Sequence, residues 1–225
     1  METKNYESIL FDLDGTLTNP KEGIVNSINY ALQKMNKPKL QESELLNFIG
    51  PPIQQSFSEI CQLNEKEVEI AVRFYREYFS KNGMIENNVY EGIPELLEEL
   101  NLNGKRLFVA TSKPTIFAKQ IISHFQLDHF FVEIVGSELD GTRINKAEII
   151  DYLFLGENDC VKESTVMIGD RFHDMIGAKL NNIDSIGVTY GYGSEDELIN
   201  SGANALANSV DHLKRMLLLD NKIKS

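Results

Sequence analysis

Short runs of apolar and β-branched residues recur along the chain, and longer segments with helical spacing separate them. Each run is bounded by turn-forming residues, which is typical of strands buried on both faces of a parallel sheet. Helical patterns lie between most of the runs, for example at Ile93–Leu102 and Thr115–Phe125, and Val210–Leu219 is predicted to form a final helix. This alternation predicts an α/β fold built on a doubly wound, Rossmann-like parallel sheet. The predicted strands lie at Ser8–Phe11, Leu107–Ala110, Val132–Val135, Val166–Ile168 and Ser185–Thr189.

The segment from residue 20 to residue 88 departs from this alternation, because it contains no convincing strand pattern. Its apolar residues follow helical spacing instead. We therefore expect an all-helical cap domain at residues 20–83, inserted after the first strand, while residues 1–19 and 84–225 form the catalytic core. Gly50-Pro51-Pro52 is a rigid cap turn that either faces the site or separates two helices. The helical stripes comprise Ile24, Ile28, Ala31, Leu32 and Met35, then Leu45, Leu46 and Ile49, then Val68, Val72, Tyr75 and Phe79.

Composition and charge restrict the partners. The 225 residues can form one sizeable core with a modest insertion. A formal net charge of −12 disfavours binding to nucleic acid or to an anionic membrane surface. Cys61 and Cys160 lack the spacing of metal ligands, and we interpret both as buried apolar residues in a reducing compartment. With no signal-peptide pattern and no apolar run of membrane-spanning length, we expect a cytoplasmic monomer or homodimer.

A pentad of an acidic residue followed by Leu-Asp-Gly-Thr occurs twice, at residues 12–16 and 138–142. The first copy directly follows the predicted strand Ser8–Phe11. Because ligands of open parallel sheets bind beyond the carboxyl ends of the strands, Asp12 and Asp14 are predicted to face that crevice. The second copy is separated from its strand by Gly136-Ser137, and we interpret it as a loop turn built by Asp140-Gly141 rather than as a catalytic motif.

Three further strands are predicted to bring polar residues to the same edge of the sheet. Thr111 and Ser112 offer hydroxyl groups and backbone amides for phosphate oxygens, and Lys146 opens the predicted helix 146–153. Asp170 and Asp174 follow the fourth strand. Together with the first pentad, these residues form a site suited to a dianionic phosphate.

Several carboxylates in one crevice raise one another's pKa unless a cation compensates their charge. Mg²⁺ prefers carboxylate, carbonyl and water oxygens, usually with one or two protein carboxylates. Asp12, the backbone carbonyl of Asp14 and Asp170 could supply these ligands.

These motifs resemble those of the haloacid dehalogenase superfamily of phosphatases, which form an aspartyl-phosphate intermediate. The resemblance rests on FDLDGT at residues 11–16, Thr111-Ser112, Lys146 and GDRFHD at residues 169–174. The cap position and VTYGYGS at residues 188–194 resemble the phosphoglycolate-phosphatase-like branch. The resemblance implies a Mg²⁺-dependent hydrolase acting on a small phosphorylated metabolite, which could be phosphoglycolate, a sugar phosphate or a nucleoside monophosphate.

The same resemblance implies roles for individual residues. Asp12 would be the nucleophile and a Mg²⁺ ligand, and Asp14 the general acid and base with its carbonyl oxygen on the metal. Thr111 would hydrogen-bond the phosphoryl group, and Lys146 would balance the charge of Asp12 and phosphate. Ser112 would be a second substrate contact, although many relatives have Asn there.

Asp170 is implied to bind Mg²⁺ directly, and Asp174 to order its water molecules or Lys146. Lys113 and Arg143 lie near the site in sequence and either touch substrate or are solvated. His173 lies between the two motif acids, but no second histidine is placed to join it, and we interpret it as structural or solvent-facing.

Alternatives of the same and of a different class stay open at this stage. A phosphosugar mutase of the same fold would return the phosphoryl group from Asp12 to the substrate instead of to water. A phospho-switch signalling module would share the acid pair and lysine, but its phosphorylated Asp ends a later strand and no helical cap follows it. Dehalogenation is disfavoured, because a departing halide needs no proton, and a general acid such as Asp14 would then have no role.

Overall fold

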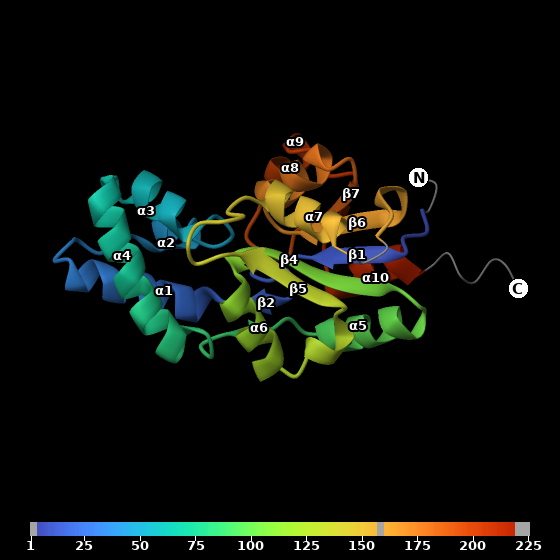
Figure 1. Ribbon diagram of the computed structural model, residues 1–225, viewed down its shortest axis with the longest axis horizontal. Helices are drawn as coiled ribbons and strands as arrows, with labels where there is room; N and C mark the ends of the chain where they lie inside the picture. The colour runs from blue at the N-terminus through green and yellow to red at the C-terminus, as the bar shows by residue number, and fades with distance from the viewer. Residues whose placement is uncertain (1–3, 157–159, 219–225) are drawn as a thin grey trace, which may run out of the picture.

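A six-stranded parallel sheet forms the centre of the core (Figure 1). The computed structural model describes residues 4–156 and 160–218. The strand order is β5-β4-β1-β6-β7-β8, so the first strand lies in the interior of the sheet between β4 and β6. The strands are β1 (Ser8–Phe11), β4 (Arg106–Pro114), β5 (Glu133–Ser137), β6 (Thr165–Gly169), β7 (Asp184–Val188) and β8 (Ala205–Ala207).

Both faces of the sheet are apolar, because successive side chains of each buried strand point to opposite faces. Ile9 and Phe11 of β1 belong to one apolar cluster, whereas Leu10 between them belongs to another. The first cluster includes helices α5 (Ile93–Leu102), α6 (Thr115–His124) and α10 (Val210–Leu218). The second includes α7 (Lys146–Leu155) and α8 (Phe172–Leu180), with α9 (Glu195–Asn200) beyond them in Figure 1. Single turns of 3₁₀-helix occur at Asp128–Phe130 and Lys162–Ser164.

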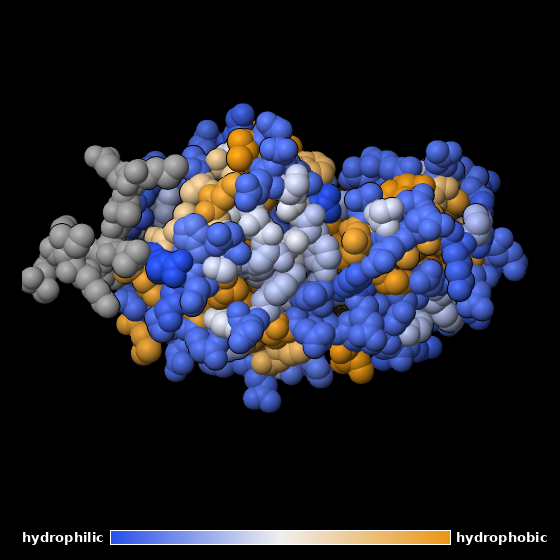
Figure 2. All heavy atoms as spheres, turned by 180° about the vertical axis from the view of Figure 1, so that it is seen from behind, coloured by the Kyte–Doolittle hydropathy of each residue, from blue (hydrophilic) through white to orange (hydrophobic). Residues whose placement is uncertain are grey.

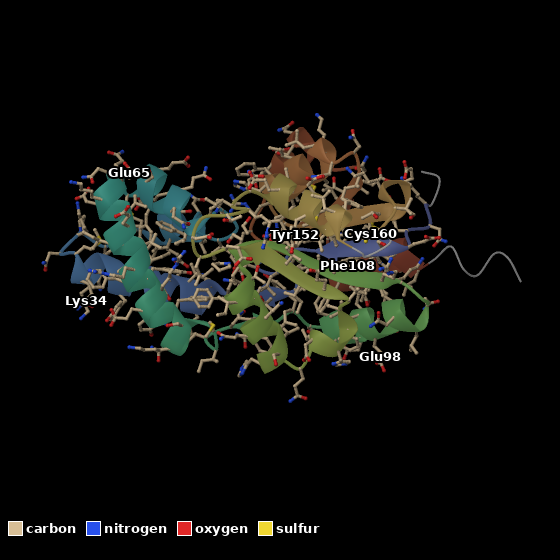
Figure 3. All side chains as sticks on the ribbon, in the orientation of Figure 1. Lys34, Glu65, Glu98, Phe108, Tyr152 and Cys160 are labelled. Carbon is tan, nitrogen blue, oxygen red and sulfur yellow. The ribbon has the colours of Figure 1, made fainter. Side chains whose placement is uncertain are left out.

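A helical cap lies at one end of the molecule (Figure 1). In the sequence it is inserted between β1 and the remaining elements of the core. Two short antiparallel strands, β2 (Thr18–Asn19) and β3 (Asn88–Val89), pair where the chain enters and leaves it. The labelled Lys34 and Glu65 in Figure 3 belong to the cap and lie far from Phe108 in the sheet. The cap comprises α1 (Lys21–Lys34), α2 (Glu42–Leu46), α3 (Ile53–Ile60), α4 (Glu65–Tyr78) and the π-helix η1 (Phe79–Gly83).

The fourth cap helix illustrates how local sequence sets these elements. The Asn64 side chain accepts a hydrogen bond from the Glu67 amide, and the Glu67 carboxylate accepts one from the Asn64 amide, which is a capping box. Ala71, Val72 and Tyr75 are buried along one face of this helix. The buried stripe continues the apolar cluster of the sheet into the cap.

The α/β class, the parallel sheet and the helical cap after β1 confirm the sequence prediction. The elements differ from the prediction in two respects. The strand predicted at Leu107–Ala110 continues to Pro114, so Thr111 and Ser112 lie within β4. Helices α3 and α9 and strands β2, β3 and β8 were not predicted, because they are short or contain few apolar residues. The last residue of the predicted final helix, Leu219, lies outside the described residues, and the cap boundaries at residues 20–83 stay a prediction.

The surface is consistent with the composition. Hydrophilic residues cover most of the face in Figure 2, and apolar residues appear between them in separate patches. Within residues 4–156 and 160–218, no helix combines the length and the apolar character needed to span a membrane. Cys61 and Cys160 are partly exposed, so the expectation that both are buried is wrong.

Candidate active site

Asp12 lies at the carboxyl end of β1, where the sheet meets the cap. Its amide donates to the carbonyl of Ile168 in β6 at 2.8 Å, which extends the ladder of the sheet by one residue. Its carboxylate is buried, with 3% of the residue exposed. The nucleophile candidate is therefore held by a rigid interior strand.

Lys146 connects Asp12 to the neighbouring segments. From the first turn of α7, its Nζ donates to Asp12 Oδ1 at 2.8 Å and to the carbonyl of Ala110 at 2.7 Å. The same Nζ lies 2.8 Å from Asp174 Oδ1. Burial lowers the pKa of the Lys146 ammonium, but Asp12 and Asp174 outweigh burial and raise it above the ordinary value. Lys146 is thus a buried ammonium group whose charge the surrounding carboxylates favour.

Asp170 and Asp174 lie beside Asp12. Asp170 directly follows β6, and Asp174 is in the first turn of α8. One carboxylate oxygen from each of Asp12, Asp170 and Asp174 lies within 4.8 Å of the others. Asp170 Oδ2 accepts from the amide of Tyr192 at 2.7 Å, and Asp174 Oδ2 accepts from the amide of Arg171 at 3.1 Å. Asp174 Oδ1 thus has Lys146 as its ion-pair partner, and Oδ2 has the Arg171 amide as its hydrogen-bond donor.

The electrostatics of this cluster fit a divalent cation. Burial, followed by the charges of Asp12 and Asp174, raises the pKa of Asp170 well above its ordinary value. Burial also raises the pKa of Asp174 to about 6, although Lys146 opposes it. Three carboxylates face one ammonium group here, and oxygen ligands in this number suit Mg²⁺. The buried cluster of Asp12, Asp170 and Asp174 is consistent with a divalent metal.

Asp14 has a different environment from Asp12. Its Oδ2 forms an ion pair with Lys113 Nζ at 2.6 Å, while Oδ1 is buried and has no hydrogen-bond partner in the part of the chain that the structure describes. Burial raises the pKa of Asp14, Lys113 opposes this effect, and the nearby Asp12 adds to it. A carboxyl group with a raised pKa and one oxygen without a partner is suited to carry a proton.

Thr111 and Ser112 lie beside the two aspartates, on the extended part of β4. The Thr111 hydroxyl accepts from the amide of Lys113 at 3.3 Å. The hydroxyl of Ser112 is buried and has no hydrogen-bond partner among the described residues. Both residues line the same pocket as Asp12 and Asp14.

The pocket is formed jointly by the core and the cap. The cap turn Gly50-Pro51-Pro52, which lies between α2 and α3, contributes to its wall, so of the two alternatives the turn that faces the site is the one observed. Four aromatic rings also line it: Phe48, Tyr75 and Phe79 from the cap and Phe117 from α6. The cap therefore shapes the space next to Asp12 and Asp14.

The second pentad forms a turn, as predicted, but the expected separation from its strand is wrong, because Gly136 and Ser137 are part of β5 and Glu138 follows that strand directly. The amide of Glu138 donates to the carbonyl of Thr142 at 2.8 Å, and Gly141 has a φ of 94°. The turn also contacts the cap, since Arg76 donates to the carbonyl of Leu139 at 3.3 Å. Glu138 lines the pocket, a position that the sequence did not indicate.

Sequence comparison supports the geometry. A family model described as "Haloacid dehalogenase-like hydrolase" matches residues 9–188. The chain belongs to the haloacid dehalogenase-like hydrolases. A 5'-nucleotidase from Pseudomonas aeruginosa strain PAO1 is 50% identical over 193 residues, which cover 86% of this chain and 87% of that protein. The tyrosine-protein kinase PtkA of Mycobacterium tuberculosis strain H37Rv is 35% identical over 93% of this chain and 72% of its own length.

Further relatives of this hydrolase support the predicted branch. A phosphoglycolate phosphatase from Colwellia psychrerythraea strain 34H is 28% identical and covers 88% of the chain and 91% of its own length. The crystal structure of a predicted phosphatase from Clostridium acetobutylicum matches with a TM-score of 0.92 at 47% identity, over 96% of this chain and all of that one. The protein is therefore an enzyme, a phosphatase of the haloacid dehalogenase-like family.

The sequence left open whether Lys113 and Arg143 contact substrate, and it predicted that His173 is structural or solvent-facing. Lys113 is buried against Asp14, so the solvated alternative is wrong for it. Arg143 pairs with Glu138 and lies 4.1 Å from the ring centre of Tyr152. His173 is partly buried, and burial lowers its pKa to about 4, which keeps the imidazole neutral at physiological pH.

The two pentads give the first test of the site. We predict that Asp12→Asn lowers turnover by on the order of 10³-fold or more, because it removes the nucleophilic carboxylate. The double substitution Glu138→Gln with Asp140→Asn should retain most of the turnover, because both residues lie outside the carboxylate cluster around Asp12, although Glu138 lines the pocket. Phosphate release by the purified, folded variants measures both. Equal losses in the two variants would contradict the distinction between the pentads.

The raised pKa of Asp174 gives a second test, in Mg²⁺-free protein. Its pKa is about 6 in the folded state, against 3.8 for an ordinary aspartate. The stability that this proton contributes is therefore full below about pH 3.8 and is lost as the pH rises through about 6. Between about pH 4.5 and pH 7, the free energy of unfolding should fall more for the wild type than for Asp174→Asn. Denaturant titrations at each pH measure this difference, and parallel pH profiles would show that the shift is absent.

Proposed function

We propose that this phosphatase hydrolyses the phosphomonoester of a small phosphorylated metabolite, with Mg²⁺ as cofactor and an aspartyl phosphate on Asp12 as intermediate. The observation that carries the proposal is the buried carboxylate cluster around Asp12, with Lys146 bonded to it, beside the pocket that core and cap share. Such a cluster is suited to bind the phosphoryl dianion through a cation and to attack its phosphorus.

In the first step, Asp12 attacks phosphorus in line with the leaving oxygen. Lys146 holds one oxygen of the Asp12 carboxylate, which fixes its orientation and balances its charge. The Thr111 and Ser112 hydroxyl groups donate to phosphoryl oxygens. A bound Mg²⁺, held by Asp12, the Asp14 carbonyl and Asp170, would neutralise charge on the phosphoryl group.

Asp14 transfers the proton in both steps. Its raised pKa allows it to give a proton to the departing alkoxide as the ester bond breaks. It then takes a proton from the water that attacks the aspartyl phosphate. Lys113 limits how far the pKa of Asp14 rises, so that the carboxylate can act as a base once it has lost its proton. The cap excludes bulk water during the first step.

The leading substrate class is nucleoside monophosphates. Tyr75 and Phe79 stack with ring centres 5.4 Å apart, and Phe79 meets Phe117 edge to face at 5.5 Å. Aromatic faces in a pocket wall suit a planar base. The 50% identical relative is named a 5'-nucleotidase, which supports the same class.

Phosphoglycolate is the second candidate, because one feature of the pocket favours it. Arg76 of the cap lines the pocket, and its guanidinium donates to a backbone carbonyl, that of Leu139. A guanidinium is a suitable partner for the carboxylate of a small acidic substrate. Several relatives carry the name phosphoglycolate phosphatase.

A substrate panel tests the function. With Mg²⁺, we expect continuous phosphate release from p-nitrophenyl phosphate and faster release from nucleoside 5'-monophosphates than from phosphoglycolate or sugar phosphates. Arg76→Ala should lower activity toward phosphoglycolate more than toward nucleotides. A single stoichiometric phosphorylation without turnover would favour a phospho-switch. Isomerised sugar phosphate would favour a mutase, and phosphate transfer to a tyrosine without release would favour the activity named for PtkA.

The role of Asp14 can be separated from that of Asp12 by the leaving group. An alkoxide needs a proton as it departs, so a placed acid contributes roughly 10²–10⁴-fold, whereas p-nitrophenolate needs little help. Asp14→Asn should therefore slow aspartyl-phosphate formation much more for an alkyl phosphate than for p-nitrophenyl phosphate. Single-turnover measurement isolates this step from the later action of Asp14 as base. Equal slowing of both substrates would exclude Asp14 as the general acid.

A further inference from the structure

Arg171 joins the segment that carries Asp170 and Asp174 to the cap. The residue is 9% exposed, although it carries a full positive charge. Its Nη1 donates to the backbone carbonyl of Ile49 in the cap, and its Nε donates to Glu197 Oε1 of α9 at 2.9 Å. The planar guanidinium thus binds an acceptor on the cap and another on the core at the same time.

The core side of this arrangement is firmly held. Glu197 Oε1 also accepts from the amide of Phe172 at 2.9 Å, and the Arg171 amide donates to Asp174 Oδ2 at 3.1 Å. These bonds lie within the core and do not depend on the position of the cap. Of the hydrogen bonds that Arg171 makes, the one to Ile49 would break if the cap moved outward.

The cap turn packs directly on the arginine side chain. Gly50 has a φ of +103°, and a Cβ atom at this residue would lie 2.6 Å from Arg171 Cγ. Any side chain at this residue would therefore collide with the arginine stem. Because Gly50, Pro51 and Pro52 line the pocket that contains Asp12, the turn that Arg171 holds is a wall of the active site. In Figure 1 the segment between α2 and α3 reaches from the cap toward the core.

We propose that Arg171 is a positioning residue that holds the cap closed on the pocket through the backbone of Ile49 and Gly50. When the cap opens, the guanidinium loses one acceptor and keeps Glu197, so the closed form is favoured. The fraction of enzyme in the closed form sets the apparent affinity for substrate. Arg171 therefore acts on substrate affinity through the cap and touches no reacting atom.

Steady-state kinetics with p-nitrophenyl phosphate and Mg²⁺ test this role. Arg171→Ala should raise KM by about tenfold or more, which is the change expected if about a tenth of the variant enzyme is in the closed form. The same substitution should change kcat much less. Arg171→Lys should recover only part of this loss, because one ammonium group cannot reproduce the fork. Lys214→Ala is the control, since Lys214 pairs with Glu99 between α10 and α5, away from the cap, and its loss should leave KM unchanged.

The distance between cap and core gives a readout that simple loss of stability would not change. Spin labels at the exposed positions Glu65 in the cap and Glu98 on α5 (Figure 3), with Cys61 and Cys160 replaced by Ser, report this distance. We expect a longer and broader distance distribution in Arg171→Ala than in the wild type. The distribution in Lys214→Ala should match the wild type.

A glycine pair provides a matched test from the cap side. Gly50→Ala introduces the collision with Arg171, whereas Gly202, with a similar φ of +101°, would place its Cβ 3.6 Å from Lys179 Cδ, an ordinary contact. Gly50→Ala should raise KM and Gly202→Ala should not. In the Arg171→Ala background, Gly50→Ala should have little further effect, because the colliding atoms are gone.

The outcomes separate this inference from the proposed function. A folded Arg171→Ala enzyme with unchanged KM and unchanged cap distance would overturn it. If that variant does not fold, equal KM values for Gly50→Ala and Gly202→Ala overturn it instead. An inactive wild type would contradict the proposed function, and the distance measurement would still decide the role of Arg171.

Discussion

The ammonium group of Lys146 is the interaction on which the active site depends. It is the buried cation that contacts Asp12, Asp174 and the carbonyl of Ala110, so it ties β1, β4 and α8 together. Breaking a buried ion pair by removing one partner costs about 3–5 kcal/mol, a large share of the roughly 5–15 kcal/mol that stabilise a typical domain. Gly177 of α8 packs against its stem, since a Cβ there would lie 2.8 Å from Lys146 Cγ. The charge and the packing of this lysine therefore hold the site in one arrangement.

The cap completes the chemistry as well as the shape of the site. Lys113, which pairs with Asp14, lies 4.5 Å from the ring centre of Phe79 in the cap. The environment that sets the pKa of Asp14 is thus partly supplied by the cap. A change in cap position would alter solvent access to this carboxylate, which links the closing of the pocket to proton transfer.

Sequence alone predicted the residues at the ends of regular strands. Asp12, Asp170 and the β4 hydroxyls could be placed because parallel strands bring their carboxyl ends to one edge. It could not place Lys113 against Asp14, because β4 continues past Ala110 with a register shift between Thr111 and Pro114 that alters the direction of the side chains. The contact of Arg171 with Ile49 joins residues 122 positions apart and depends on how the cap docks, which no local pattern records.

The two pentads show how the same residues acquire different roles. Gly15 and Gly141 both have positive φ values, so each turn favours glycine for its backbone alone. A Cβ atom at Gly15, however, would lie 2.1 Å from Asp170 Oδ2, whereas one at Gly141 would meet only Ile144, at 3.7 Å. The first turn packs against Asp170, which directly follows the adjacent strand β6, whereas the second turn packs against no acidic residue among those described. Each pentad contains two acidic residues, but the three-carboxylate cluster forms at the first copy, where the segment after β6 adds Asp170 and Asp174 to Asp12.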